Sequence, residues 1–273
     1  MSRREGRILQ RMYSLPGGAL WVFAVKQAWA ALFGGLLLIA IIFTNYVDLP
    51  WLSRYDWLFV WAVLVQVGML VFRLERPREV IAIVLFHLVG LGMELFKTSS
   101  TVGSWTYPED STIRLLTVPL FSGFMYAAVG SYLTRVWRVL HLRFTGYPNR
   151  WATAVLAILI YANFFTHHYM YDVRYVLFAG VIVLYARTKV YFRLHISEYS
   201  MPLIVGFALI ACVIWLAENV ATFTKVWLYP PQVGTWQIVG IEKWGSWFLL
   251  MIISFIMVDI LRAAFSKFGD KAK

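Results

Sequence analysis

Residues 201–219 read MPLIVGFALIACVIWLAEN, a run whose single charged side chain, Glu218, lies at its end. A helix needs about 20 apolar residues to cross the hydrocarbon core of a bilayer, so this run has the length and composition of a membrane span. The rest of the chain has the same character, because 60% of its 273 residues are hydrophobic and only 14% are charged. This composition predicts a surface that faces lipid, and we expect an integral membrane protein.

Eight apolar runs qualify, or nearly qualify, as membrane spans. They cover residues 26–45, 56–73, 79–97, 114–134, 151–168, 173–192, 201–219 and 243–265. The sequence therefore predicts an all-α fold, in which residues 1–273 form a single membrane domain with about eight transmembrane helices. The first run lacks a convincing cleavage site for a signal peptidase, so we expect a retained helix.

The basic residues predict the orientation of the helices. Of the 25 Lys and Arg residues, 19 fall on one side of the predicted membrane. They are Lys26 and the basic residues within 3–11, 73–78, 135–150, 187–193 and 262–273. Cytoplasmic connections are enriched in Lys and Arg, so we predict that both termini lie in the cytoplasm. The net charge of +11 is divided among short clusters and forms no continuous face, so we expect no nucleic-acid partner.

Two parts of the chain resemble each other. Residues 94–98 read ELFKT and residues 105–108 read WTYP, while residues 218–222 read ENVAT and residues 227–230 read WLYP. The glutamates are 124 positions apart and the first tryptophans 122 positions apart. A gap of two residues therefore aligns both pairs, which indicates an internal repeat.

The repeat predicts how the helices are arranged. It pairs the third predicted helix with the seventh and the fourth with the eighth, and Gly123 and Gly245, also 122 positions apart, extend the match. A shift of four spans preserves the direction across the membrane. We therefore expect two parallel four-helix repeats, residues 1–134 and 151–265, related by a pseudo-twofold axis along the membrane normal.

Polar residues within the predicted spans gather toward the non-cytoplasmic side. Ionisable groups inside a span are costly and usually face the interior of the bundle, so each is a candidate for function. Glu94 ends the third predicted helix, Glu218 ends the seventh, and Asn163 and His167 end the fifth. His87 lies two helical turns before Glu94 and is expected on the same face. If the repeat holds, the glutamates face one central cavity across its axis.

Other readings of these polar residues stay open. Each glutamate can instead pair at the membrane interface with Lys97, Lys225 or a donor in a connection. His167 and His168 are metal-ligand types, but adjacent side chains on a helix point about 100° apart and seldom bind one ion. We therefore predict no metal and no cofactor.

Residues 103–109, GSWTYPE, and residues 118–130, VPLFSGFMYAAVG, resemble a family of bacterial integral membrane proteins known as a domain of unknown function. The resemblance covers most of the chain, from the first predicted helix to the last. It implies a multi-pass protein of the bacterial inner membrane and implies no activity.

A more distant resemblance is to the membrane carotenoid cyclases and hydratases, which are helical, contain related halves and place glutamates near helix ends close to Trp and Tyr. The residues that look like this arrangement are Glu94 with Trp105 and Tyr107, and Glu218 with Trp227 and Tyr229. The Pro-x-Glu-Glu signature of the cyclases is absent, since residues 119–122 read PLFS and residues 241–244 read IEKW. The resemblance therefore implies architecture more than chemistry.

These observations predict an enzyme that acts on an isoprenoid or similar apolar membrane lipid, with Glu94 and Glu218 as proton donor and carboxylate partner. Protonation of an alkene gives a carbocation, which aromatic faces stabilise. The residues expected at the substrate are Trp105, Tyr107, Trp227, Tyr229, His87, Asn163 and His167. Three alternatives stay open: a proton- or cation-coupled transporter, a metal-dependent lipid hydrolase and a noncatalytic membrane scaffold.

Overall fold

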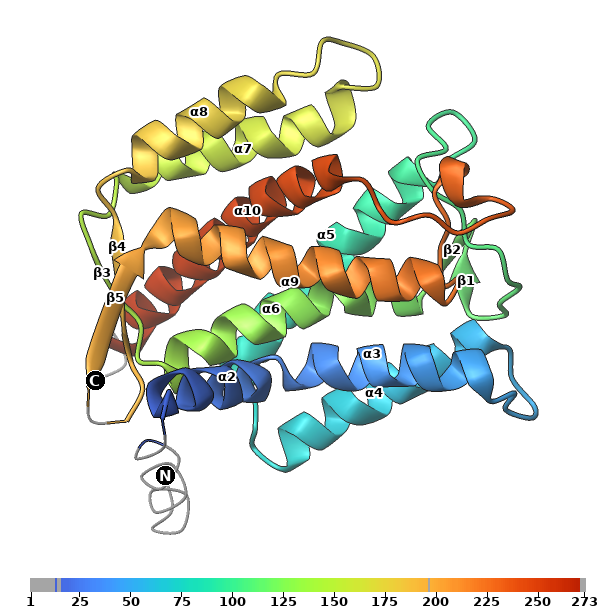
Figure 1. Cartoon of the computed structure of the whole chain (residues 1–273), viewed down its shortest axis with the longest axis horizontal. Coiled ribbons are helices and arrows are strands. Elements are labelled where there is room, and N and C mark those ends of the chain that lie inside the picture. The colour runs from blue at the N-terminus through green and yellow to red at the C-terminus, as the bar shows by residue number, and fades with distance from the viewer. Residues whose placement is uncertain (1–12, 14–15, 196, 271–273) are drawn as a thin grey trace.

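The computed structural model describes residues 13, 16–195 and 197–270 (Figure 1). The basic residues near the termini on which the predicted orientation partly depends, Arg3, Arg4, Arg7, Arg11, Lys271 and Lys273, lie outside these residues. Long helices run along the horizontal axis of Figure 1, and their connections gather at the two ends of the bundle.

Helices make up most of the described chain. The first group is α2 (Gly18–Ala30), α3 (Leu32–Tyr46), α4 (Arg54–Val71), α5 (Pro77–Lys97) and α6 (Phe121–Val139). The second group is α7 (Arg150–Thr166), α8 (Arg174–Tyr185), α9 (Leu203–Phe223) and α10 (Ile241–Asp270), with a short 3-10 helix η1 (Pro230–Gln232) before α10.

Four of the described helices, α4, α5, α9 and α10, are long and apolar enough to cross a membrane. The pair α2 and α3, bent by 75° at the break between them, forms a fifth candidate span, while α7 and α8 are apolar but shorter. The prediction of a mostly helical chain is confirmed, and several of its helices have the length and apolar composition of membrane spans. The predicted number of eight spans is not confirmed, because four or five helices meet the length and composition of a span.

Two of the predicted spans include residues that form strands. In the predicted span 114–134, β1 (Arg114–Leu115) and β2 (Val118–Pro119) pair as a short antiparallel hairpin, so the helix α6 begins only at Phe121. Leu116 adopts a φ of 54° in the turn of this hairpin. In the predicted span 173–192, the helix α8 ends at Tyr185, because β4 (Lys189–Arg193) follows.

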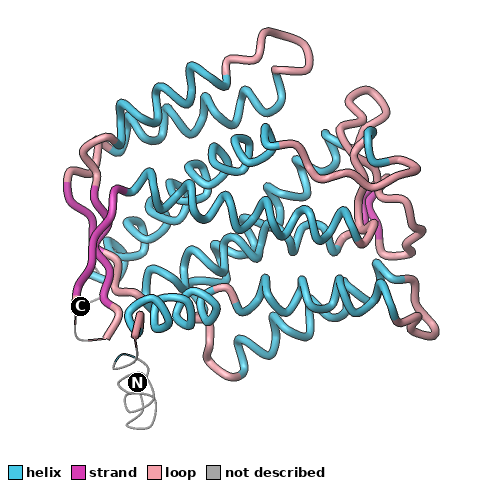
Figure 2. Tube along the Cα trace, in the orientation of Figure 1, coloured by secondary structure: helices cyan, strands magenta, loops and turns pink. Residues whose placement is uncertain are grey.

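The second set of strands forms a three-stranded antiparallel sheet. Its order is β3 (Arg143–Thr145), β4 and β5 (Glu198–Pro202), and Phe144, Val190 and Met201 are register partners across it. Val190 and Phe192 are buried, whereas the residues between and beside them are more exposed, as expected of a strand with one covered face. The basic residues within 135–150, which the sequence places in one cytoplasmic connection, are therefore divided among the end of α6, β3 and the start of α7. Figure 2 shows this sheet at the opposite end of the bundle from β1 and β2.

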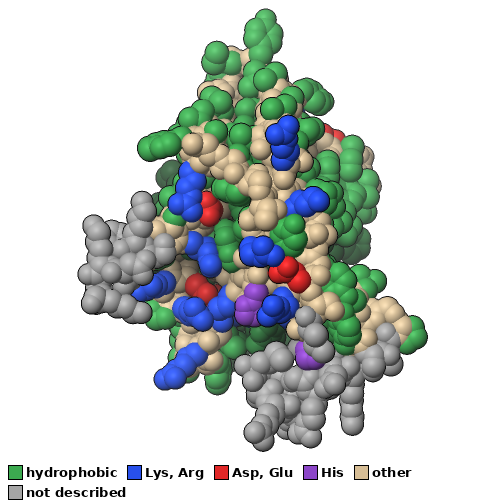
Figure 3. Space-filling view, turned by 90° about the vertical axis from the view of Figure 1, so that its left-hand side faces the viewer, with side chains coloured by type: hydrophobic (Ala, Val, Ile, Leu, Met, Phe, Trp, Pro, Cys, Tyr) green, Lys and Arg blue, Asp and Glu red, His purple; other side chains and the backbone are tan. Residues whose placement is uncertain are grey.

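The end of the bundle that carries the sheet is strongly basic (Figure 3). Exposed basic residues in the connections that include or lie near the sheet are Arg143, Arg187, Lys189 and Arg193, and the connection from α4 to α5 adds Arg73 and Arg76. These belong to the side that the sequence predicts to be cytoplasmic. The glutamate-bearing ends of α5 and α9 lie at the opposite end (Figure 1).

A side chain of α6 stabilises the break between α2 and α3. Arg135 of α6 is 1% exposed, and its guanidinium donates to the carbonyl oxygens of Trp29 (2.5 Å), Ala30 (3.2 Å) and Leu74 (2.9 Å). The last carbonyls of a helix have no partner within the helix. Arg135 therefore satisfies the end of α2 inside the bundle and stabilises the bend.

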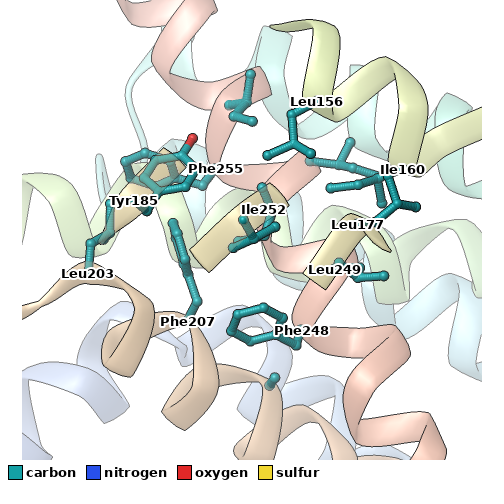
Figure 4. Close-up of a cluster of buried hydrophobic side chains, with 14 of the residues drawn as sticks. Leu156, Ile160, Leu177, Tyr185, Leu203, Phe207, Phe248, Leu249, Ile252 and Phe255 are labelled. Carbon is teal, nitrogen blue, oxygen red and sulfur yellow. The ribbon is translucent and has the colours of Figure 1, made fainter. Parts of the chain in front are cut away.

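Three contacts within a first set of helices, α3 to α6, recur within a second set, α7 to α10. α5 packs on α6 as α9 packs on α10, α3 packs on α6 as α7 packs on α10, and α3 packs on α4 as α7 packs on α8. The sets differ in that α4 packs on α6 whereas α8 packs on α9, and α6 contacts α10 between the sets. Figure 4 shows the core of the second set, where Leu156 and Ile160 of α7 meet Phe207 of α9 and Ile252 of α10. A separate core in the first set contains Phe33, Leu37, Tyr55, Leu58 and Phe121.

Candidate functional site

Glu94 lies in the last turn of α5 and is only 2% exposed. Its buried carboxyl accepts three hydrogen bonds. Its Oε2 accepts from Trp105 Nε1 (2.8 Å) and from the Tyr107 hydroxyl (2.8 Å), and its Oε1 accepts from the Tyr126 hydroxyl (2.9 Å). Trp105 and Tyr107 follow α5 in the chain, and Tyr126 belongs to α6. An ionised carboxylate only accepts hydrogen bonds, so this set of donors suits it.

Glu218 occupies the corresponding place in α9 and is 3% exposed. Its Oε1 accepts from the Tyr229 hydroxyl (2.5 Å), and its Oε2 accepts from Trp247 Nε1 (2.8 Å). Trp247 belongs to α10 and was not among the predicted site residues. Trp227, the predicted tryptophan, packs instead against the core that contains Tyr55 and Phe121.

The two connections that follow these helices are bonded to each other. Thr106 and Leu228 exchange backbone hydrogen bonds of 2.9 Å in each direction and form an isolated antiparallel bridge. They are the middle residues of Trp-x-Tyr in the two motifs. The ring of Trp105 also packs edge-on against the ring of Tyr229, with 6.0 Å between their centroids. The partner of Glu94 therefore touches the partner of Glu218.

Both glutamates line one cavity with a volume of about 660 Å³. The cavity wall also includes Trp105, Tyr126, Trp227, Tyr229 and Trp247, but it is otherwise mostly apolar. The expectation that the two carboxyls face one cavity agrees with this geometry. From the glutamates the lining continues as far as Gln27 of α2 and Phe192 of β4, at the sheet end. The cavity thus has the size of a small-molecule site and an elongated, largely apolar interior.

Three cations also line the cavity. Lys97 is 6% exposed, and its Nζ lies 2.7 Å from Nε2 of His168. Lys243 Nζ lies 4.1 Å from the centroid of the Tyr229 ring. Arg174 forms an ion pair with Asp172 (2.6 Å).

Asn163 and His167 line the cavity near these cations. Asn163 is 7% exposed; its amide donates to Asp172 Oδ1 (3.1 Å), and its Oδ1 accepts from the backbone of Val173 (3.2 Å). His167 Nδ1 lies 2.7 Å from the carbonyl oxygen of Asn163. These bonds shape the connection between α7 and α8, so both residues have a structural role besides their place in the wall.

His87 is not brought together with the other candidates. Its ring packs against Phe124, with 4.6 Å between centroids, and against Gly123. It is absent from the cavity lining, and its Nδ1 is buried without a partner among the described residues. As the spacing of seven residues predicts, His87 lies on the face of α5 that packs on α6. That face extends beyond the cavity wall, so His87 contacts α6 and does not line the cavity.

The protonation of two tyrosines outside the helices follows from their surroundings. Burial raises the pKa of Tyr107 well above its ordinary value, and the charge of Glu94 raises it further. Burial raises the pKa of Tyr229 in the same way, and the charge of Glu218 adds to it. Both phenols therefore keep their protons and stay hydrogen-bond donors to the glutamates at neutral pH.

Within the described part of the chain, no group of three or more His, Cys, Asp or Glu side chains is arranged to hold a metal ion. The alternative of a metal-dependent hydrolase required His87, His167, His168 and the glutamates to converge. The aromatic donors around each carboxyl and the separate position of His87 do not fit that arrangement.

Comparisons with known proteins place the chain in a family. A family model described as "Protein of unknown function (DUF817)" matches residues 19–255. The chain is also 43% identical to "Uncharacterized protein YoaT" of Bacillus subtilis (strain 168) over 251 residues, which covers 92% of this chain and 94% of that protein. No solved structure matches.

Proposed function

Since the chain belongs to the DUF817 family of proteins of unknown function, as its resemblance to an uncharacterised family predicted, we propose a function from the site itself. The protein binds an elongated lipid of isoprenoid type in its cavity and moves protons to and from that lipid with Glu94 and Glu218. The observation that carries this proposal is that both carboxyls line one cavity whose wall is otherwise mostly apolar.

The reaction needs no partner beyond the lipid. One carboxyl adds a proton to a carbon of a C=C bond, which leaves a carbocation on the neighbouring carbon. The other carboxylate then removes a proton from an adjacent carbon, so a double bond forms again and the numbers of protons and electrons are unchanged. The product is an isomer or a ring. The faces of Trp105, Tyr229 and Trp227 at the cavity stabilise the cation.

The proposed orientation has eight crossings of the inner membrane, with α2 and α3 as one broken span and both termini in the cytoplasm. Residues 1–134 and 151–265 are then parallel halves. The basic sheet end of the bundle supports the orientation (Figure 3). The matching helix contacts and the bridge between Thr106 and Leu228 support the repeat, since equivalent residues meet at a twofold axis.

One set of measurements tests this orientation. With Cys212 replaced by Ala, single cysteines at Tyr171 and Arg187 report on the two ends of the bundle. We expect a membrane-impermeant thiol reagent added to intact cells to label the cysteine at position 171 and not the one at position 187. Labelling of both positions, or the reverse pattern, contradicts the orientation.

A second candidate function is transport, and the length of the cavity favours it. The lining runs from the glutamates to Phe192 at the sheet end and includes Ala31, where the first candidate span is broken. Broken helices and parallel halves around a central site are features of transporters. In this case the glutamates hold a proton or the polar end of a cargo and do not alter the lipid.

Deuterium incorporation separates the two functions. The protein is purified in nanodiscs with its bound lipid, incubated in D₂O, and the extracted lipid is measured by mass spectrometry. Proton transfer to carbon predicts a heavier lipid with wild type and a rate about 100-fold lower with Glu94→Gln/Glu218→Gln. The matched control is Glu198→Gln, an exposed carboxyl on β5.

Equal incorporation by wild type and the double variant contradicts the enzymatic proposal. Bound lipid that gains no deuterium but crosses sealed vesicles only with wild-type glutamates indicates the transporter. Absence of any bound lipid, with or without an added polyprenol, contradicts both.

A further inference from the structure

Two amines at the glutamate end of the cavity have no part in the proton transfer proposed above. Lys97 is almost fully buried, and its only hydrogen-bond partner among the described residues is Nε2 of the His168 ring. The ammonium of Lys243 lies 4.1 Å from the ring centroid of Tyr229 and 5.8 Å from that of Trp105, and the charges of Glu218 and Glu242 act on it without direct contact. No carboxylate in the described part of the chain lies within 4.0 Å of either amine. Lys97 is buried and Lys243 is partly buried, and a poorly solvated ammonium without a direct anionic contact is unfavourable, so both amines can gain from an anionic ligand.

Three of the carboxylates near the amines have other partners, while the fourth, Glu242, is exposed. Glu94 and Glu218 are bonded by tryptophan and tyrosine donors, and Asp172 is paired with Arg174. Lys97 lies close enough to Lys243 and Arg174 for their charges to repel it. None of these carboxylates forms an ion pair with Lys97 or Lys243, so a bound anion gives both amines the direct ionic contact that they lack among the described residues.

We propose that Lys97 and Lys243 bind the anionic head group of the lipid in the cavity, with phosphate as the group that fits this pair of amines. The hydroxyls of Ser104 and Ser246 line the same part of the cavity and add neutral donors. This inference rests on the proposed function, because it assumes that a lipid occupies the cavity. It names the substrate class as an isoprenoid or alkyl phosphate, which the cavity binds in preference to a free alcohol or hydrocarbon.

The position of Lys243 also predicts where on the lipid the chemistry occurs. Its ammonium lies over the ring of Tyr229, which donates to Glu218, and near the ring of Trp105, which donates to Glu94. A head group held by Lys243 is therefore next to both carboxyls. The double bond that reacts is one near the phosphate, and the rest of the chain extends toward Phe192.

Binding of matched amphiphiles tests the inference. Full-length protein in phosphatidylcholine nanodiscs is titrated with dodecyl phosphate and dodecanol, which share one chain, and with inorganic phosphate, and cavity tryptophan fluorescence reports binding. We expect dodecyl phosphate to bind about tenfold more tightly than dodecanol. Lys97→Met/Lys243→Met removes this preference and leaves dodecanol binding unchanged. Lys97→Arg/Lys243→Arg keeps the preference, and Lys225→Met, at an exposed amine outside the cavity lining, has no effect.

Each other outcome overturns a stated part of the proposal. Equal affinity of the wild type for dodecyl phosphate and dodecanol, or a preference that survives in the Met variant, overturns the head-group assignment but leaves the lipid cavity in place. Inorganic phosphate that competes as well as dodecyl phosphate shows a site for a free anion. Failure of every amphiphile to bind overturns the proposed function itself. Retained dodecanol binding by the Met variant shows that it has folded.

Discussion

The carboxyl sites of Glu94 and Glu218 differ in how completely they are bonded. Glu94 has three donors, two of them from the connection after its own helix. Glu218 has two, and its tryptophan comes from α10 instead of the equivalent connection. The difference arises because residues 224–229 extend into the other core, where Val226 is fully buried and its carbonyl accepts from Tyr55 (2.8 Å). Trp227 is thereby drawn away from Glu218.

The different donors suggest different roles for the Glu94 and Glu218 carboxyls in the proposed reaction. In the proposed reaction, Glu94, which has three donors, is assigned the role of carboxylate and proton acceptor. Glu218 has more unused acceptor capacity and faces Lys243 over Tyr229, so its surroundings change more when a ligand or proton arrives. Glu94 and Glu218 therefore share a residue type and deep burial but differ in their partners.

The largest losses of unfolding free energy are expected when either carboxyl is removed. Glu94→Ala leaves three buried donors without an acceptor, and Glu218→Ala leaves two. At about 1–2 kcal/mol for each orphaned donor, we expect losses of roughly 3–6 and 2–4 kcal/mol respectively. Thermal or denaturant unfolding in one detergent measures both. A larger loss for Glu218→Ala contradicts the comparison, and the Gln variants, which keep an acceptor oxygen, are expected to lose less.

The glycines at equivalent positions in α6 and α10 sharpen the comparison. A Cβ at Gly123 lies 2.6 Å from the His87 ring, whereas a Cβ at Gly245 lies 3.0 Å from the edge of Phe178. We expect Gly123→Ala to cost about 1–3 kcal/mol of unfolding free energy because the buried ring must move. Gly245→Ala is expected to cost less than about 1 kcal/mol. Gly92→Ala, with nothing within 4 Å, is the control that tolerates the methyl group.

The tyrosines predict a smaller, pH-dependent effect. The pKa of Tyr107 and of Tyr229 is raised on folding, first by burial and then by the adjacent glutamate. A raised pKa contributes stability that is complete below the ordinary tyrosine pKa of about 10 and is lost as the pH rises above it. At neutral pH, Tyr229→Phe is expected to cost about 1–2 kcal/mol and Tyr107→Phe less, because Glu94 keeps two other donors.

Unfolding measured between neutral and strongly alkaline pH checks this prediction. The stability of wild type should fall above about pH 10, and its advantage over each Phe variant should shrink there. An advantage that stays constant, or that grows with pH, contradicts the assigned donors.

Most of the helices could be predicted from sequence, because long apolar runs determine them directly. The break at Ala31 could not, since it depends on Arg135, a residue distant in sequence that bonds the last carbonyls of α2. The strand Lys189–Arg193 reads KVYFR, an alternation of polar and apolar residues that indicates a strand, but hydropathy averaged over a span length conceals it.

The two glutamates and three of their aromatic donors, Trp105, Tyr107 and Tyr229, could be predicted because similar motifs mark them in the sequence. Trp247 could not, since no motif relates it to Glu218 and only the packing of α10 against α9 brings it near. The amines Lys97 and Lys243 were predicted to be on the same side of the membrane as the glutamates. Their shared position on one cavity depends on the tertiary arrangement.

The bridge between Thr106 and Leu228 has a consequence for biosynthesis. The backbone partner of Thr106 is synthesised 122 residues after it, when α5 and α6 have already left the ribosome. Until then the connection after α5 lacks its partner strand, and the aromatic donors around Glu94 lack part of their support. Contacts of such long sequence separation form late and slowly. A chain truncated after α6 is therefore expected to insert into the membrane while the connection after α5 stays incompletely folded. Such an unpaired connection is expected to make the truncated chain a substrate for membrane quality-control proteases.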